Sequence, residues 1–443
     1  MATNVNAQLH SLTNLITTSV HDIISVYASV GQTVPSLDSL EPGPFDGAVE
    51  DVPERLVRAI KIIEAACTQL VCTVSSPSGL IYNATNGHAE PSALLVVTQA
   101  RIADILVDKP EGLHVDQLAE ASGFKDADKL GRLMRLLASR HVFREVKPNV
   151  YVNNRLSAKF ISKYPMCDIV GLQTDEGMRA TAYLYETYTT EPRVPNETPL
   201  QRAYGVPLFD WYKLPENKDK GERFNRAMVA LGDVYGKGFL AKSYPWGEFS
   251  GECTICDIAG GNGHVTMRLL KKHPQFKVVL QDQAEVIEQA KEYWAKEHPQ
   301  ALADKKVEFV PFNFLENVAV AGCDVYYMKS ILKRHDWPDA ECRVILQNVR
   351  KAMKPGARLV IHEIAIHSPA RFAQRAEERA PEPLLPNWGA SAARTYEADI
   401  RMMKMFNAKE RTLEELTTLW HVQFSNLGLY PAGEMDLVEF VAV

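Results

Sequence analysis

This sequence lacks three features that would assign a protein to a broad class. It has no run of about 18 consecutive apolar residues, the length that a membrane-spanning helix needs. Its first residues, MATNVNAQLHSL, lack the basic start, apolar stretch and cleavage site of a secretory signal. Its net charge of −6 gives no overall attraction for nucleic acid. We therefore expect a soluble, cytoplasmic protein that binds neither membranes nor nucleic acid.

Cysteine is scarce, and its positions form no disulfide framework. The seven cysteines are an odd number, which suits a reducing compartment. Cys253 and Cys256 form one Cys-x-x-Cys pair, which by itself is compatible with redox chemistry or with half of a zinc site. No second pair or histidine stands at zinc-finger spacing, and Cys256 falls in an apolar stretch. We therefore expect buried free thiols and no metal.

The length of 443 residues exceeds the roughly 100–200 residues of one domain, so two or more cores are expected. Apolar residues at helical spacing predict helices over 7–31 and 52–74, joined by a linker rich in proline and glycine. Three further helices, expected over 93–107, 115–121 and 126–140, precede a hairpin in VFREVKPNVYVNN. This order is that of a winged helix.

A winged helix often places one helix in the DNA major groove. Arg132 and Arg135 on the expected third helix fit such a role, but Leu130, Leu133 and Leu137 turn much of that helix toward a core. A fold alone does not determine a function, and a domain with the features of an enzyme follows in the same chain.

From Cys253 onward, short apolar strands alternate with helices, which predicts a parallel, doubly wound α/β sheet. LEELTTLWHVQFSNLGL and DLVEFVAV are expected to add a last helix and a last strand. Ser368 to Glu397 is too long for an ordinary connection and is interpreted as a lid or a disordered excursion. We predict three domains: a helical and winged-helix domain (1–165), a helical bridge that roofs the substrate (166–250) and a cofactor-binding domain (251–443).

A glycine-rich turn follows the first strand of this sheet. In DIAGGNGHVT, Gly260, Gly261 and Gly263 permit a tight turn and a close approach of a ligand to the backbone. Asp282 ends the next strand, where a carboxylate can accept both hydroxyl groups of a ribose; a helix N-cap is the alternative interpretation. The glycines do not follow the Gly-x-Gly-x-x-Gly spacing of dinucleotide sites. A single adenosyl group is therefore favoured over a nicotinamide cofactor.

Five motifs together carry a family resemblance: CDIAGGNGH, VVLQDQAEVIEQA, HDWPDAEC, LVIHEIAI and NAKERTLEEL. They resemble the S-adenosylmethionine-dependent O-methyltransferases of the plant caffeate type and their fungal relatives, over most of the chain. The resemblance implies a class I methyltransferase Rossmann-like sheet preceded by a winged-helix dimerisation domain. It also implies an intertwined homodimer, S-adenosylmethionine as cofactor and a small natural product as substrate.

The same resemblance implies the cofactor contacts. They go to the methionine end (Asp257, Gly260, Gly261, Gly263), to the ribose (Asp282) and to the adenine (Asn313, Phe314). The family more often has aspartate at position 313, but asparagine can also hydrogen-bond an adenine amino group.

In the family's catalytic loop, a basic residue and three further residues precede the histidine that acts as the base. Here Lys329 fits the first position, but Lys333 stands four places later and His335 only two beyond that. One interpretation keeps His335 as the base after a two-residue insertion, with Glu363 and Glu410 orienting its imidazole. The other places Lys333 at the base's position, where an ammonium group is a good donor to an oxyanion or a carbonyl oxygen.

The second arrangement resembles a fungal offshoot of the family, the S-adenosylmethionine-binding pericyclases of 2-pyridone alkaloid pathways. It implies dehydration of a pyridone alcohol to a quinone methide, then Alder-ene or hetero-Diels-Alder closure without methyl transfer. Lys333 would hold the substrate carbonyl, and Met228 would line the pocket. We favour this function over an O-methyltransferase acting on a phenol or enol. A winged-helix regulator that senses S-adenosylmethionine is a third hypothesis, and it predicts salt-dependent duplex binding.

Each proposed catalytic residue also has a structural alternative. Lys333 and Arg334 fit a solvated pair of cations. Glu363 fits a satisfied carboxylate at a strand end, Glu410 fits the first turn of the next helix, and Met228 fits a helix core.

Overall fold

The computed structural model describes residues 5–249, 251–333, 339–370, 379–419 and 424–443. The chain forms two compact units. The first consists of Met1–Gly47, Asp51–Val234 and Pro369–Ser391, and the second of Ala48–Glu50, Tyr235–Ser368 and Ala392–Val443. Within the described ranges, no helix combines the length and the apolar character that crossing a membrane requires.

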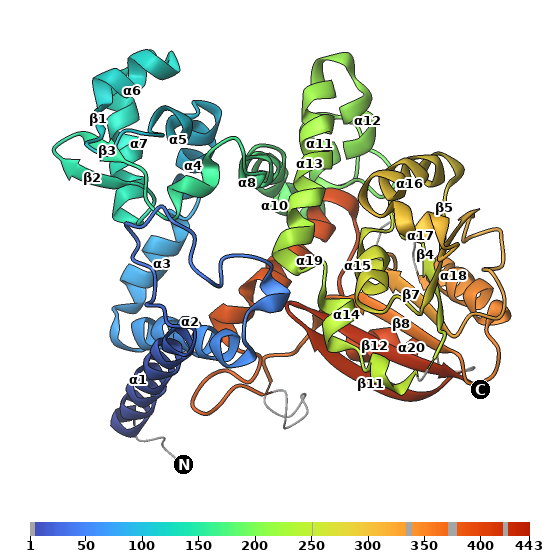
Figure 1. Ribbon diagram of the computed structural model, residues 1–443. Helices are drawn as coiled ribbons and strands as arrows, with labels where there is room; N and C mark the ends of the chain where they lie inside the picture. The colour runs from blue at the N-terminus through green and yellow to red at the C-terminus, as the bar shows by residue number, and fades with distance from the viewer. Residues whose placement is uncertain (1–4, 250, 334–338, 371–378, 420–423) are drawn as a thin grey trace. The chain divides into compact units, whose positions relative to one another are not determined.

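Two long helices open the first unit, as the sequence predicts. α1 (Val5–Ser29) and α2 (Glu54–Val74) pack side by side, with Leu12 of α1 buried in one cluster with Ile62 and Ala66 of α2 (Figure 1). α3 (Pro77–Thr85) follows and has a proline in its first turn, where the missing backbone N–H leaves no hydrogen bond unmade.

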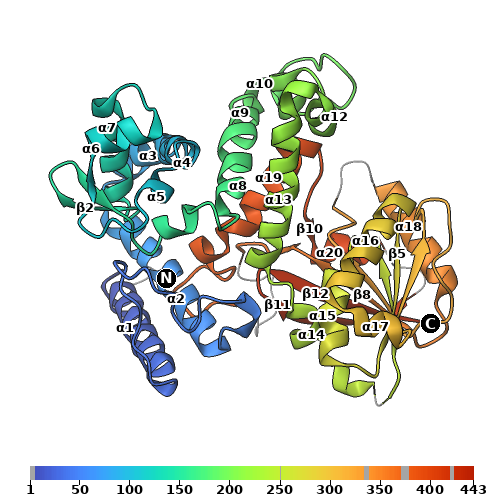
Figure 2. The same cartoon turned by 45° about the horizontal axis from the view of Figure 1, so that its top comes forward.

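The winged helix lies next along the chain (Figures 1 and 2). Its helices are α4 (Ala89–Gln99), α5 (Ile102–Ile105), α6 (Val115–Ser122) and α7 (Ala127–Ser139). Its strands β1 (Leu113–His114), β2 (Arg144–Lys147) and β3 (Val150–Val152) form a sheet of order β1-β3-β2. The single helix expected over 93–107 is wrong: Arg101 has φ 51, a left-handed conformation that a right-handed helix cannot pass through, and it separates α4 from α5.

The core of the winged helix uses the leucine-rich face of α7. Leu130, Met134 and Leu137 are fully buried in it. Arg132 and Arg135 point away from this core and are exposed, and Arg132 pairs with Asp128 one turn earlier at 2.5 Å.

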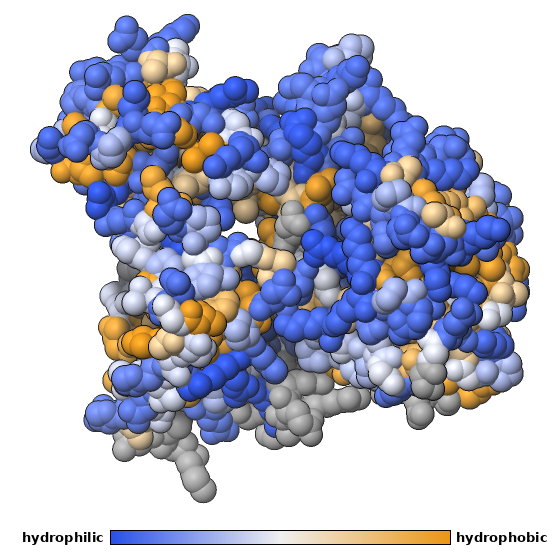
Figure 3. Space-filling model, in the orientation of Figure 1, coloured by the Kyte–Doolittle hydropathy of each residue, from blue (hydrophilic) through white to orange (hydrophobic). Residues whose placement is uncertain are grey.

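Large apolar side chains are exposed on the helices before the winged helix. Ile81 and Tyr82 of α3 are each 69% exposed, and Val74 at the end of α2 is 63% exposed. Figure 3 shows apolar surface in the region of α2. Exposed apolar groups that gather in one region mark an interaction surface more often than isolated ones do.

Short helices joined by turns make up the rest of the first unit. They are α8 (Met166–Gly171), α9 (Gly177–Ala182), α10 (Leu184–Thr189), α11 (Pro199–Tyr204), α12 (Leu208–Lys213) and α13 (Lys218–Tyr235), whose last residue belongs to the second unit. Leu172–Glu176 forms a π-helical turn between α8 and α9.

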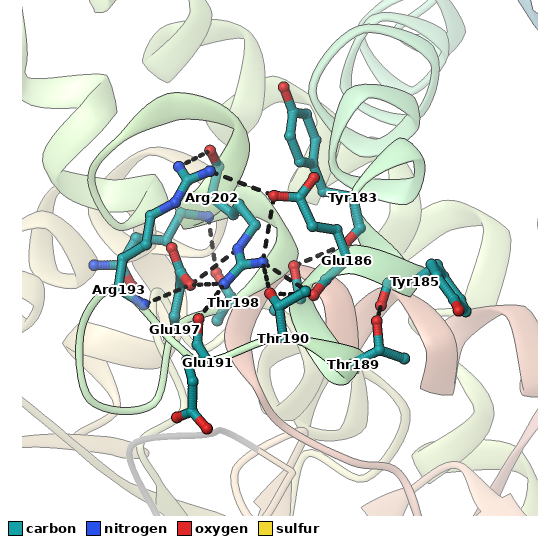
Figure 4. A network of polar contacts seen from close by, with 12 residues as sticks. Tyr183, Tyr185, Glu186, Thr189, Thr190, Glu191, Arg193, Glu197, Thr198 and Arg202 are labelled. Atoms are coloured by element: carbon teal, nitrogen blue, oxygen red, sulfur yellow. Dashed lines mark hydrogen bonds and ion pairs between the residues drawn. The ribbon is translucent and has the colours of Figure 1, made fainter.

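A buried arginine fixes the loop between α10 and α11 (Figure 4). The Arg202 guanidinium donates to Glu197 Oε2 at 2.6 Å, to Thr190 Oγ1 at 2.6 Å and to the carbonyl of Glu191 at 3.0 Å. The side chains of Arg202 and Glu197 are each only 2% exposed. The loop therefore wraps around one cation, and its hydrogen bonds compensate for burying that charge.

A seven-stranded sheet of order β11-β12-β8-β7-β4-β5-β6 organises the second unit. Its parallel strands are β4 (Thr254–Ile258), β5 (Lys277–Asp282), β6 (Val307–Pro311), β7 (Val325–Lys329) and β8 (Arg358–Glu363). β12 (Met435–Ala442) runs antiparallel to β8, and β11 (Phe424–Ala432) antiparallel to β12. The doubly wound sheet is confirmed, but it is mixed at this edge.

Helices cover both faces of the sheet (Figure 2). One face packs against α14 (Phe239–Ser243), α15 (His264–Lys272), α16 (Ala284–Glu297) and α17 (Pro299–Ala303). The other packs against α18 (Asp339–Ala352) and α20 (Leu413–Thr418). Successive strand residues alternate between the two cores: Tyr327 belongs to the first, and Tyr326 and Met328 to the second.

The C-terminal part differs from the sequence prediction. The single last helix expected over LEELTTLWHVQFSNLGL is wrong, because the helix α20 ends at Thr418 and the strand β11 begins at Phe424. Thr412 and Glu415 form a capping box that starts α20, and β10 (Arg411–Thr412) pairs in parallel with β9 (Ala365–Ile366).

The long segment from Ser368 to Glu397 lies partly outside the described residues. Its part from Arg379 to Ser391 belongs to the first unit, where Ala380 and Leu384 are buried against α1 and α2. Gln69 of α2 donates to the carbonyl of Pro383 at 2.9 Å. This part is therefore a packed element of the helical unit. α19 (Ala393–Phe406) then belongs to the second unit.

Candidate active site

Most of the predicted site residues lie at one edge of the sheet in the second unit. Asp257 is the last residue but one of β4, and Asn313 follows β6. The strands β5, β7 and β8 end at Asp282, Lys329 and Glu363. These strands are parallel, so their carboxyl ends meet at the same edge. β4 stands between β5 and β7, where the strand order reverses. Open α/β sheets bind ligands at this kind of position.

The glycine turn after β4 has open surroundings at Gly261 and close packing at Gly263. Gly261 has φ 62, and a Cβ added there would meet no atom of a described residue within 4 Å, so its surroundings in this part of the chain are open. Gly263 has φ 72, and a Cβ there would lie 2.7 Å from Trp294 Nε1. Trp294 donates to the carbonyl of Asn262 at 2.9 Å, which holds the turn against α16. Glycine is required at 263 by both conformation and space.

Asp282 secures the same turn from the neighbouring strand. Its Oδ2 accepts the backbone N–H of Gly261 at 2.8 Å, and its Oδ1 accepts the N–H of Gln283 at 2.8 Å. Gln283, not Asp282, is the N-cap residue of α16. The carboxylate is partly exposed at the sheet edge.

Asp257, which is buried, and Lys329, which is partly buried, influence each other's charge at this edge. Thr266 Oγ1 of α15 donates to Asp257 Oδ2 at 2.6 Å. Burial raises the pKa of Asp257 to about 7, against the hydrogen bond from Thr266. Burial, and next the charge of Lys333, lowers the pKa of Lys329 to about 8, whereas Asp257 acts in the opposite direction. Both groups therefore titrate within reach of neutral pH.

Asn313 and Phe314 follow β6 at the same edge. The Asn313 side chain is exposed, and its Oδ1 accepts the N–H of Leu315 at 3.1 Å. Phe314 is partly buried and packs against the core on the α18 side of the sheet.

The loop after β7 is held by two acidic residues. Glu363 Oε1 accepts the backbone N–H groups of Ile331 at 2.7 Å and Leu332 at 3.0 Å. Lys333 Nζ donates to Glu410 Oε1 at 3.0 Å, with side chains 19% and 1% exposed. Lys333 is therefore a largely buried, paired ammonium group and not a solvated loop cation.

The charges around Lys333 decide its protonation. Burial alone lowers its pKa, but the carboxylates of Glu410 and Glu363 outweigh burial, and the pKa is raised. Burial raises the pKa of Glu363, while Lys333 opposes this. The second oxygens of Glu363 and Glu410 are buried and have no hydrogen-bond partner among the described residues. Lys333 is thus protonated at neutral pH and can donate a proton or a hydrogen bond, but it cannot accept a proton.

The two remaining predicted site residues are His335 and Met228. His335 and Arg334 lie outside the described residues. Met228 lies on α13 in the first unit, where its side chain is 39% exposed.

Sequence reasoning missed three polar residues at this edge. Thr266 contacts Asp257, and His362 Nδ1 lies 2.7 Å from the hydroxyl of Tyr327. Arg411 contacts Leu332 in the loop after β7 and Asp339 at the start of α18. Only Arg411 had a sequence signal, since it directly follows Glu410 in KERT.

A mixed sheet of this order, with a glycine turn after the first strand and an acidic residue ending the second, defines a class I methyltransferase Rossmann-like fold. Residues 189–423 match the O-methyltransferase domain, and residues 82–163 match the O-methyltransferase dimerisation domain. The chain belongs to the O-methyltransferase family, and its cofactor is S-adenosylmethionine.

Known relatives agree with this assignment. The chain is 41% identical to 3-O-methyltransferase 2 of Phanerochaete chrysosporium, over 98% of this chain and 97% of the relative. The solved structure of the mitomycin 7-O-methyltransferase MmcR matches with a TM-score of 0.64 and 25% identity, over 83% of this chain and 98% of MmcR. Human N-acetylserotonin methyltransferase, solved with S-adenosylmethionine, matches with a TM-score of 0.62 and 19% identity, over 83% and 99%. This last likeness concerns the fold alone.

Proposed function

We propose that this protein transfers the methyl group of S-adenosylmethionine to a phenolic or enolic hydroxyl group of a small natural product. The observation that carries the proposal is the 41% identity, over nearly the whole of both chains, with a protein named as a 3-O-methyltransferase. The pericyclase function that we favoured from the sequence has no such support and becomes the second candidate.

The carboxyl edge of the sheet fits the cofactor. Asp257 and the turn of Gly260, Gly261 and Gly263 would hold its methionine end, with Lys329 beside Asp257. Asp282 would accept the ribose hydroxyls, and Asn313 and Phe314 would contact the adenine. The open surroundings of Gly261 and the partly exposed carboxylate of Asp282 support this assignment. When bound, the cofactor supplies an electrophilic methyl group on a sulfonium.

Within this proposal, His335 is the proton acceptor and Lys333 is not. A hydroxyl group attacks faster as its proton leaves, and a neutral imidazole suits that task near neutral pH. Lys333 is protonated in its pair with Glu410, so its role is to stabilise negative charge that develops on the substrate oxygen. The second oxygens of Glu363 and Glu410, which are buried and unpaired among the described residues, are available to orient a donor on this loop.

The test is the product balance for a panel of phenols and enols incubated with the protein and S-adenosylmethionine. The proposal predicts one S-adenosylhomocysteine for each methylated product. His335→Ala should abolish turnover, and Lys333→Met should slow it. Lys354→Met is the matched control, because Lys354 pairs with Asp324 at 2.6 Å but is half exposed.

The second candidate is a pericyclase that binds S-adenosylmethionine without using its methyl group. One observation favours it: Lys333 stands where the family's base is expected and is held as a cation by Glu410. A pyridone alcohol would then be dehydrated and cyclised with no S-adenosylhomocysteine formed, and Lys333→Met would abolish turnover while His335→Ala would not. The same incubations, with a pyridone alcohol added to the panel, distinguish the two candidates.

We also propose a homodimer. The match of residues 82–163 to a dimerisation domain supports it, and so do the exposed apolar side chains of α2 and α3. Light scattering during size-exclusion chromatography should give twice the mass of the 49.5 kDa chain. A monomer at micromolar concentration would contradict the dimer.

A further inference from the structure

Arg411 is a buried cation that the proposed chemistry leaves without a role. Its side chain is 5% exposed and lies in β10, directly after Glu410. β10 is anchored on both sides, because it pairs with β9 and because Thr412 caps α20. The guanidinium therefore projects from a rigid segment, which is the kind of segment that can hold another one in place.

Its hydrogen bonds to described residues fall on the loop after β7 and on the start of α18. Nη1 donates to the carbonyl of Leu332, and Nη2 donates to Asp339 Oδ1 at 3.0 Å and to Cys342 Sγ at 3.6 Å. The Cys342 thiol in turn donates to the carbonyl of Leu332 at 3.5 Å. One guanidinium thus joins the residue before Lys333 to the first turn of α18.

The loop is held from the opposite side by Glu363, which takes the N–H groups of Ile331 and Leu332. Leu332 is therefore fixed through both its N–H and its carbonyl, by two side chains from different strands. Lys333 leaves this fixed point and reaches Glu410, the neighbour of Arg411. The position of the Lys333 ammonium group thus depends on Arg411 as well as on Glu410.

We propose that Arg411 is a positioning residue, which fixes Leu332 and Asp339 and thereby holds the Lys333–Glu410 pair where the reaction needs it. This inference rests on the proposed function. Arginine suits the task because its planar fork can donate to a carbonyl and a carboxylate at once. Lysine offers one charged nitrogen and cannot join both in the same geometry.

The first test measures how firmly the loop is held, and it needs no substrate. Hydrogen–deuterium exchange of the intact protein should be faster in Arg411→Met than in wild type for peptides covering 329–333 and 339–343. Arg358→Met is the matched control: Arg358 begins β8 at the other end of the strand and pairs with Glu248 at 2.6 Å and Glu439 at 3.2 Å. Arg358→Met should leave the exchange rates of those peptides unchanged. Equal exchange in Arg411→Met and wild type would overturn the inference.

The second test reads the reaction. A misplacement of about 1 Å can cost on the order of 100-fold in rate, so kcat of Arg411→Met should fall by about that factor. KM for S-adenosylmethionine should stay within about twofold, since Arg411 contacts none of the proposed cofactor residues. Arg411→Lys should be intermediate, and added guanidinium ion should restore part of the activity of Arg411→Ala.

These readouts separate the two proposals. If the wild type forms no methylated product, the proposed function fails, and the exchange experiment still decides the position of the loop. If the wild type is active and Arg411→Met loses no more kcat than Arg358→Met, Arg411 is not a positioning residue. Should Arg411→Met fail to fold, Arg411→Lys with the same exchange and kinetic measurements replaces it.

Discussion

Breaking the Lys333–Glu410 pair should destabilise the second unit, and the double-mutant cycle on this pair is the sharpest energetic test of the site. Lys333→Met leaves the Glu410 carboxylate, which is 1% exposed, without its cation and next to Glu363. Removing one partner of a fully buried pair costs about 3–5 kcal/mol. Lys333 is 19% exposed, so water compensates in part, and we expect about 2–3 kcal/mol.

Adding Glu410→Gln to Lys333→Met should recover most of this loss, because the surviving charge is then gone. Urea unfolding at neutral pH measures the four free energies of unfolding, with equal slopes required for the comparison. The control pair, Lys354 and Asp324, is 51% and 31% exposed and should couple by less than about 1 kcal/mol. If the effects of Lys333→Met and Glu410→Gln add to within about 0.5 kcal/mol, the two side chains do not form the pair described, and the account of the loop is wrong.

Two further changes follow from the structure. Gly263→Ala should lower both the stability of the protein and its affinity for S-adenosylmethionine. The φ of 72 at Gly263 and the 2.7 Å distance to Trp294 leave no room for a Cβ atom. Calorimetric titration measures the affinity, and unchanged binding would contradict this prediction. Hydrogen bonding to Arg202 lowers the pKa of Glu197, so this pair stabilises the first unit above the usual carboxylate pKa of 4.5, and the contribution is lost as the pH falls through the lowered pKa. Arg202→Met should therefore destabilise the protein more at pH 7 than at pH 3, where the contribution of Glu197 is reduced while the contacts of Arg202 with Thr190 and the Glu191 carbonyl persist. Circular dichroism follows the unfolding, and an equal loss at both values would refute the assignment.

The sequence allowed the sheet and its carboxyl edge to be predicted because their signals are local. Short apolar runs mark the strands, the glycines of DIAGGNGH mark the turn after β4, and Asp282 follows from the end of the next strand. The two long N-terminal helices were predicted for the same reason. By contrast, the break at Arg101 carries no proline or glycine, so nothing in the local pattern indicated it.

The environment of Lys333 could not be predicted because it depends on a residue 77 positions away. Two adjacent cations usually point into water, and only the three-dimensional structure places Glu410 against the first of them. Arg411 is a similar case, since its partners Leu332 and Asp339 lie 79 and 72 positions away in the sequence. Contacts of this kind, between residues far apart in the sequence, determine the chemistry of the loop, and the spacing of residues in the sequence does not predict them.

Transfer of an isotopically labelled methyl group tests the proposed function most directly. The protein would be incubated with the phenol panel and with S-adenosylmethionine that carries a deuterated methyl group. Mass spectrometry would then measure the masses of the products. We predict that the deuterated methyl group appears on the oxygen of one phenol or enol, in step with consumption of the cofactor. A substrate that is converted while the labelled cofactor is recovered intact would contradict methyl transfer.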